Sequence, residues 1–98
     1  MHFAVICWDA AGSAERRRAS LEAHRGYVDA HADALVVSGA LLADEGGARI
    51  GQLFVLDVAD REAAEAFVAA DPLSLSGVFG DVVITPMAVK FLAGERLG

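Results

Sequence analysis

Two titratable side chains, His24 and Asp71, are candidates for acid–base chemistry in this sequence. His24 lies between Leu21 and Tyr27 in a stripe at three- and four-residue spacing, where an imidazole must be hydrogen-bonded or open to a cleft. Histidine is the most frequent general acid or base in enzymes because it titrates near neutral pH. The same pattern is typical of a structural histidine with one satisfied nitrogen, so His24 alone leaves both interpretations open.

Asp71 stands directly before Pro72, and this position has a structural explanation of its own. The proline disfavours the α region at Asp71, so a helix is expected to end at Ala70. Aspartate followed by proline is also a strong cap for a further helical turn over Leu73–Ser76. Because spacing does not reveal which residue the carboxylate faces, capping and a role in a reactive site both remain open.

Other polar residues give weaker signals. Ser74 and Ser76 could form hydrogen bonds beside Asp71, although serines after Asp-Pro are more often residues of a first helical turn. Arg16–Arg18 place positive charge near the start of a helix, against its dipole, in a chain of net charge −6. They predict a solvated face or, alternatively, a contact with an anionic substrate group, for which Arg17 is the candidate. Cys7, inside a strand, is interpreted as a buried apolar residue rather than a nucleophile.

The elements that must position these residues follow the order βαββαβ. Ser13 and Asp60 are the expected N-caps of the two helices, Asp44–Gly47 has the composition of a hairpin turn, and Pro86 indicates an edge position or a bulge. The predicted strands are His2–Trp8, Leu35–Leu42, Gly51–Val58 and Asp81–Val89, and the predicted helices are Ala14–Ala32 and Arg61–Ala70. This order predicts one α+β domain over residues 1–98, a ferredoxin-like sandwich with two helices on one face of a four-stranded antiparallel sheet.

Composition excludes several classes of function. With 14 acidic and 8 basic residues, the chain is not expected to bind nucleic acid. One cysteine, three scattered histidines and the lack of a glycine-rich phosphate loop argue against a metal or any other cofactor. No apolar run is long enough to span a bilayer, and the N-terminus does not resemble a signal peptide, so a cytoplasmic protein without a membrane partner is expected.

The first and last strands are apolar on both faces, although helices are expected to cover only one. The first strand offers Phe3 and Val5 to one side and Ile6 and Trp8 to the other. Since a large exposed apolar patch usually marks an association surface, we expect a homodimer that packs sheet against sheet. Trp8 and Met87, near strand ends, are expected beside the pocket or the dimer interface.

Several short motifs in order resemble those of the YCII (YciI-like) family. They are His24 with Tyr27 three residues on, Gly39 inside the second strand, and Ala70-Asp71-Pro72 followed by Gly77-Val78. The resemblance covers nearly the whole chain and implies a ferredoxin-like fold, assembly as a dimeric α/β barrel, and an active-site histidine and aspartate at His24 and Asp71.

The sequence departs from the family pattern at three positions that could line a pocket. Ala40 stands where a proline is usual, and Leu73 and Met87 stand where aromatic residues are usual. The resemblance therefore does not imply a particular substrate.

A paired histidine and aspartate could perform general acid–base catalysis. The carboxylate would fix the imidazole tautomer and leave the other ring nitrogen aimed at a substrate proton. We therefore expect His24 and Asp71 to be hydrogen-bonded beside a solvent-reachable cavity. The candidate substrate contacts are Trp8, Arg17, Tyr27, Gly39, Ser74 and Ser76.

Three hypotheses about function remain. The first is a small cofactor-independent enzyme that acts on a small organic substrate by elimination, isomerisation or hydrolysis. The second is a non-catalytic dimeric module that binds a metabolite or a protein, and the third is a monooxygenase-like member of the same superfamily. The fold alone does not choose among them, since this architecture hosts many functions.

Overall fold

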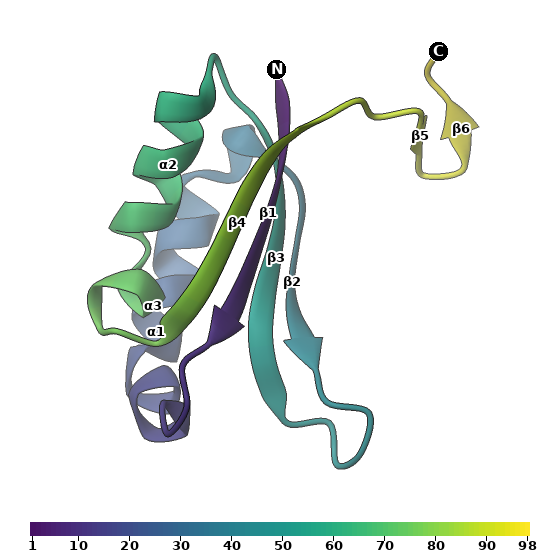
Figure 1. The fold of residues 1–98 in the computed structure, drawn as a ribbon. Coiled ribbons are helices and arrows are strands. Elements are labelled where there is room, and N and C mark those ends of the chain that lie inside the picture. The colour runs from purple at the N-terminus through teal and green to yellow at the C-terminus, as the bar shows by residue number, and fades with distance from the viewer.

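Four antiparallel strands form one sheet in the order β2-β3-β1-β4, and the helices lie on one of its faces (Figure 1). The computed structural model describes residues 1–98. The strands of this sheet are β1 (His2–Asp9), β2 (Leu35–Leu42), β3 (Arg49–Asp57) and β4 (Phe79–Met87). The helices are α1 (Ala14–Ala30), a 3-10 turn (Ala32–Ala34), α2 (Arg61–Ala70) and α3 (Pro72–Leu75). The predicted α+β sandwich and its βαββαβ order are confirmed.

The helix ends differ from the prediction in two details. Ser13 precedes α1, but its side chain makes no capping hydrogen bond, because its φ of −95° and ψ of 3° are not the extended conformation of a capping residue. Helix α1 ends at Ala30, two residues early, where the His31 N–H donates to both Tyr27 O and Val28 O. Asp60 does cap α2, with its carboxylate accepting from the Ala63 N–H at 2.8 Å.

The apolar core lies between α2 and the two central strands. Every second residue of β1 is buried from Phe3 to Cys7, and in β3 the inward-facing residues are Gln52, Phe54 and Leu56. The phenyl rings of Phe54 and Phe67 meet edge to face at 5.2 Å between centroids. The buried members of this core are Phe3, Val5, Cys7, Phe54, Leu56, Ala64, Phe67 and Val68. Helix α1 is different, because its only buried residues are Arg17 and His24.

The other face of the sheet carries apolar side chains and no helix (Figure 1). The antiparallel register places Ile6 between Leu53 and Val83 on this open face. Trp8 is 45% exposed and Met87 is 42% exposed there. The predicted second apolar face is confirmed, and β4, which contains Pro86, is an edge strand as expected.

Beyond β4 the chain leaves the sheet and forms a small hairpin that the sequence did not predict. Its strands are β5 (Phe91–Leu92) and β6 (Glu95–Arg96), and it stands away from the body of the molecule (Figure 1). The Arg96 guanidinium lies 4.5 Å from the centre of the Phe91 ring. No helix of the chain is both long and apolar enough to cross a membrane.

Candidate functional site

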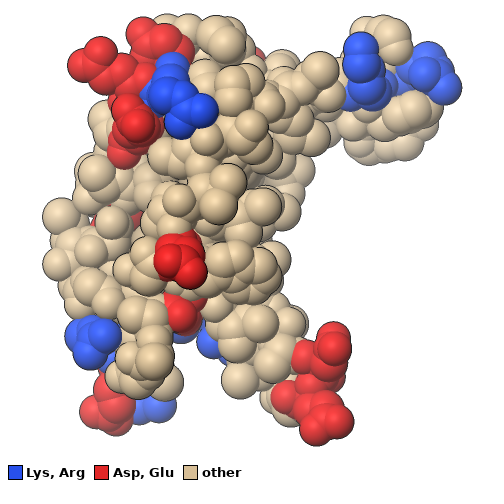
Figure 2. Space-filling view, viewed as in Figure 1, with Lys and Arg blue, Asp and Glu red and all other residues tan.

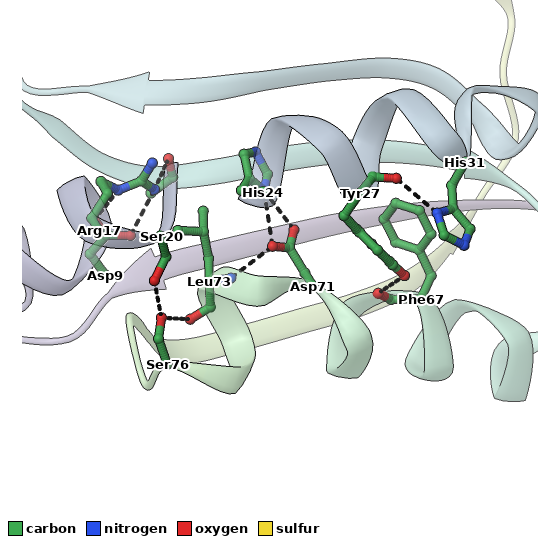
Figure 3. Close-up of polar contacts among 11 residues, drawn as sticks. Asp9, Arg17, Ser20, His24, Tyr27, His31, Phe67, Asp71, Leu73 and Ser76 are labelled. Atoms are coloured by element: carbon green, nitrogen blue, oxygen red, sulfur yellow. Dashed lines mark hydrogen bonds and ion pairs between the residues drawn. The ribbon is translucent and has the colours of Figure 1, made fainter. Parts of the chain in front are cut away.

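Helix α1 attaches to the rest of the molecule through a stripe of polar side chains (Figure 3). Arg17, Ser20, His24 and Tyr27 recur at intervals of three and four residues, which places them on one face of the helix. Each donates or accepts a hydrogen bond to a residue that is 34 or more positions away in the chain. Directional polar contacts therefore hold α1 in addition to the packing of Tyr27 and Val28 against the core, whereas α2 is held mainly by apolar packing.

His24 and Asp71 form the most buried of these contacts. The His24 Nδ1 lies 2.9 Å from each oxygen of the Asp71 carboxylate. His24 is 6% exposed and Asp71 is 0% exposed. Because a carboxylate only accepts, Nδ1 carries the donated proton and a neutral ring leaves its Nε2 unprotonated. The predicted hydrogen bond between these two residues is present.

Asp71 is also a helix cap, so both interpretations of this residue hold. Its φ of −62° and ψ of 131° end α2, and its carboxylate accepts from the Leu73 N–H at 2.9 Å to start α3. Pro72 fills the first position of α3, where a missing N–H costs nothing. The cap fixes the carboxylate in place, and this position faces α1 and His24 (Figure 3).

Four buried residues keep an unpaired polar atom. These atoms, which make no hydrogen bond in the chain, are Ser13 Oγ, Arg17 Nη1, His24 Nε2 and those of the Gln52 side-chain amide. Every side-chain nitrogen or oxygen atom that is itself sealed from solvent has a hydrogen-bond partner. Each of these unpaired atoms must therefore touch solvent. On the imidazole, the nitrogen that could exchange a proton with a ligand is thus the accessible one.

Gln52 was not among the predicted site residues, yet it is 4% exposed on the helix-facing side of β3. The signal for it was the alternation along this strand. Gln52, Phe54 and Leu56 share the inward face, and a glutamine at such a position is a buried polar group without an obvious partner.

Arg17 is buried, so the prediction of a solvated arginine triplet is wrong for its middle member. Its Nε and Nη2 donate to the two carboxylate oxygens of Asp9 at 2.7 and 3.0 Å, and Nη2 also donates to Gly51 O at 3.0 Å. Position 17 lies seven residues before His24, which is two helical turns and the same face. Arg16 and Arg18 are exposed, as predicted.

The other predicted substrate contacts are not gathered at one place. The Tyr27 hydroxyl donates to Phe67 O at 2.7 Å, and Ser76 links the Ser20 hydroxyl to Leu73 O, so both join α1 to its neighbours. Ser74 makes no side-chain hydrogen bond.

Trp8 and Gly39 lie on the open face, because their register partners are Gly51 and Leu53. The sheet therefore separates these two residues from the His24–Asp71 pair.

Two hollows lie beside the start of α1, and neither reaches the pair. The first, of about 290 Å³, is lined by Ala14, Arg17, Arg18, Leu21, Gly47, Ala48 and Arg49. The second, of about 220 Å³, is lined by Asp9, Ala10, Gly12, Ser13, Ala14, Arg49 and Ile50. A third, of about 390 Å³, lies under Tyr27, His31 and Phe67. Because none is lined by His24 or Asp71, the predicted cavity beside the pair is wrong for the single chain.

Cys7 is inert as a nucleophile. Burial raises the pKa of its thiol from 9.0 to about 12, and the carboxylates of Asp71 and Asp9 add to the rise while Arg17 opposes it. The thiol therefore stays protonated at neutral pH, in agreement with the interpretation of Cys7 as a buried apolar residue.

The raised pKa predicts a loss of stability in alkaline solution. Between pH 9.0 and about 12 the folded thiol keeps a proton that the unfolded chain has lost, so the free energy of unfolding should fall as pH rises. The slope for one proton is about 1.4 kcal/mol per pH unit. The free energy of unfolding, measured with urea across this pH range, should fall less steeply with pH in Cys7→Ala than in the wild type. An equally steep fall in both proteins would contradict the prediction.

Comparison with known proteins supports the fold. The family model of the YCII-related domain matches residues 1–88, which end just before the β5–β6 hairpin. The solved structure of 5-chloro-2-hydroxyhydroquinone dehydrochlorinase (TftG) from Burkholderia phenoliruptrix, a complex with 2,5-dihydroxybenzoquinone, aligns with a TM-score of 0.84. That alignment covers 90% of this chain and 94% of that one at 22% sequence identity, which shows a common fold. No curated protein sequence matches.

Proposed function

This chain belongs to the YCII-related family, and we propose that it is a small cofactor-independent enzyme in which His24 moves a proton on a small organic substrate. The observation that carries the proposal is the His24–Asp71 contact, with Nδ1 bound to a fully buried carboxylate and Nε2 unpaired and touching solvent. An imidazole fixed in this way has its basic nitrogen directed outward.

The reaction would use His24 first as a base and then as an acid. Nε2 accepts a proton from the substrate, and the imidazolium that forms is stabilised by the Asp71 carboxylate. The proton then passes to a leaving group, to another substrate atom or to water, which gives an elimination, an isomerisation or a hydrolysis. General acid–base catalysis of this kind contributes typically about 10²- to 10⁴-fold in rate.

Elimination is the reaction type that the comparisons favour. The aligned TftG structure is named a dehydrochlorinase, and removal of hydrogen chloride from an organic molecule is an elimination. Its ligand, 2,5-dihydroxybenzoquinone, is a small organic molecule. A single base with no metal or redox partner is sufficient for this class of reaction, and that matches the groups that His24 and Asp71 offer.

Proton exchange with deuterated water tests the proposal, because it detects proton abstraction whichever reaction follows. A panel of small organic molecules with an acidic C–H group is incubated with the protein in D₂O, and deuterium uptake is read by mass spectrometry. We expect uptake in at least one compound, and a loss of about 10²- to 10⁴-fold in His24→Gln.

His31→Gln is the matched control for this assay. His31 lies on the same helix face, but its Nδ1 bonds only to Tyr27 O of its own helix. Exchange that persists in His24→Gln, or that falls equally in both variants, would refute the assignment of His24 as the base.

One observation favours a second candidate, a non-catalytic dimeric module that binds a metabolite or a protein. No hollow of the single chain is lined by His24 or Asp71, which is the arrangement expected of a purely structural pair. In the exchange assay such a module would bind compounds without catalysing uptake of deuterium.

We also propose that a second copy of the chain covers the open face of the sheet. Trp8, Val83 and Met87 are each more than 40% exposed there and form part of one apolar surface. Sedimentation at micromolar concentration should show a dimer, and Val83→Asp should dissociate it. A wild-type monomer whose Trp8 is quenched as efficiently as free indole would contradict this assembly.

A further inference from the structure

The two hollows at the start of α1 meet at one free cation. Both are lined by Ala14 and Arg49, so the Arg49 side chain lies at their junction. The structure gives Arg49 no ion pair and no side-chain hydrogen bond. Figure 2 shows a notch at the lower side of the molecule, between the start of α1 and the β2–β3 hairpin.

Arg17, one of the residues that line the first hollow, is buried and has one unpaired nitrogen. Arg17 is 5% exposed, and two of its three nitrogens are taken by Asp9 and Gly51 O. Its third nitrogen, Nη1, has no partner and touches solvent, and Arg17 lines this hollow. Asp9 holds the guanidinium rigid, so Nη1 is a preorganised hydrogen-bond donor.

Charge is concentrated in this hollow against the trend of the whole molecule. The chain has net charge −6 and only eight basic residues, yet three of them, Arg17, Arg18 and Arg49, line the first hollow. Asp9 balances Arg17 and Glu15 pairs with Arg18 at 2.9 Å, which leaves the charge of Arg49 uncompensated. An anionic group is the ligand that this set of donors fits.

This hollow and His24 lie at different levels of the same helix and the same strand. Arg17 contacts Gly51 O on β3, and the His24 ring lies 6.5 Å from the Phe54 ring on the same strand. Gln52, whose side-chain amide is unpaired, lies between Gly51 and Phe54 along β3. Seven residues of helix separate Arg17 from His24, which is about 10 Å along the axis.

We propose that the first hollow binds a small organic acid, whose anionic group is held by Arg17 Nη1 and Arg49. Neither hollow at the start of α1 is lined by Gln52 or His24, so this site is separate from the candidate base. The inference therefore goes beyond the proposed function and does not depend on it.

Benzoate and benzamide are a matched pair of probes, since they share a shape and differ in charge. Each is titrated into the ¹⁵N-labelled protein at constant ionic strength, and binding is followed by NMR shifts of Arg17 and Arg49. We expect benzoate to bind and benzamide to leave these signals unchanged. Arg49→Gln should weaken benzoate binding about tenfold, the loss expected for one charge-assisted hydrogen bond.

Two further variants make the outcome specific. Arg61→Gln removes one positive charge from an exposed position at the start of α2. This variant should bind benzoate as the wild type does. His24→Gln should also keep benzoate binding, so a failure of the catalytic assignment would not be mistaken for a failure of the anion site. Equal binding of benzoate and benzamide, no binding of benzoate, or equal losses in Arg49→Gln and Arg61→Gln would overturn the proposal.

Discussion

Asp71→Ala is expected to lower the free energy of unfolding by about 2–4 kcal/mol. The substitution removes the cap of α3 and leaves the buried Nδ1–H of His24 without an acceptor. Loss of a cap costs about 1 kcal/mol, and a buried donor without a partner costs about 1–3 kcal/mol. Asp71→Asn keeps an acceptor oxygen and should lose less. Urea denaturation measures both losses of unfolding free energy, provided that the dependence of this free energy on urea concentration is unchanged.

Asp60→Ala is the control that separates capping from pairing. Asp60 caps α2 through the Ala63 N–H and has no histidine partner, so its loss should cost about 1 kcal/mol. If Asp71→Ala costs no more than Asp60→Ala, the His24–Asp71 hydrogen bond does not stabilise the fold. The account of a preorganised pair would then be wrong.

Gly51→Ala is expected to destabilise the protein by roughly 3 kcal/mol or more, by overpacking of a central strand. A Cβ atom at this position would overlap the backbone carbonyl oxygen of Cys7 and would stand 3.1 Å from Leu41 Cδ1 and 3.4 Å from Trp8 Cε3. The backbone of β1 cannot move away without disturbing its ladder with β3. Gly51 O also accepts a hydrogen bond from Arg17, so the shift would reach the Arg17 guanidinium.

Gly39→Ala is the matched control on the neighbouring strand. Gly39 shares the open face with Gly51, but a Cβ there would meet nothing within 4 Å. Its substitution should change the free energy of unfolding by no more than about 0.5 kcal/mol. Equal effects of the two substitutions in thermal or urea unfolding would show that close packing at Gly51 is not what excludes a side chain.

The fold was predictable because local signals and hydrophobic pattern agree in most of the chain. The apolar run of β1, the Asp60 cap and the Asp71-Pro72 break each specify one boundary, and the structure has elements at all three. The C-terminal hairpin was missed because strands of two residues carry no alternation to detect. Ser13 was assigned a capping bond from its type alone, and its backbone conformation does not allow one.

The site was predictable only in part, and the reasons differ from residue to residue. Spacing left the partner of Asp71 open, and it was the resemblance to a family that joined it to His24. The burial of Arg17 was visible in principle, because position 17 shares a helix face with position 24, but three consecutive arginines suggested a solvated surface. Whether a cavity lies beside the pair depends on how tightly α3 closes over it, and pattern does not specify this.

The ¹⁵N NMR spectrum of the His24 ring tests the assignment of His24 as a base, since it reports which ring nitrogen carries the proton. At a pH where the ring is neutral, the account predicts a protonated Nδ1, bound to Asp71, and an unprotonated Nε2 that faces solvent. Asp71→Asn should weaken this preference by removing the carboxylate that fixes it. A neutral ring that carries its proton on Nε2 in the wild type would contradict the account, because His24 would then offer no base to a substrate.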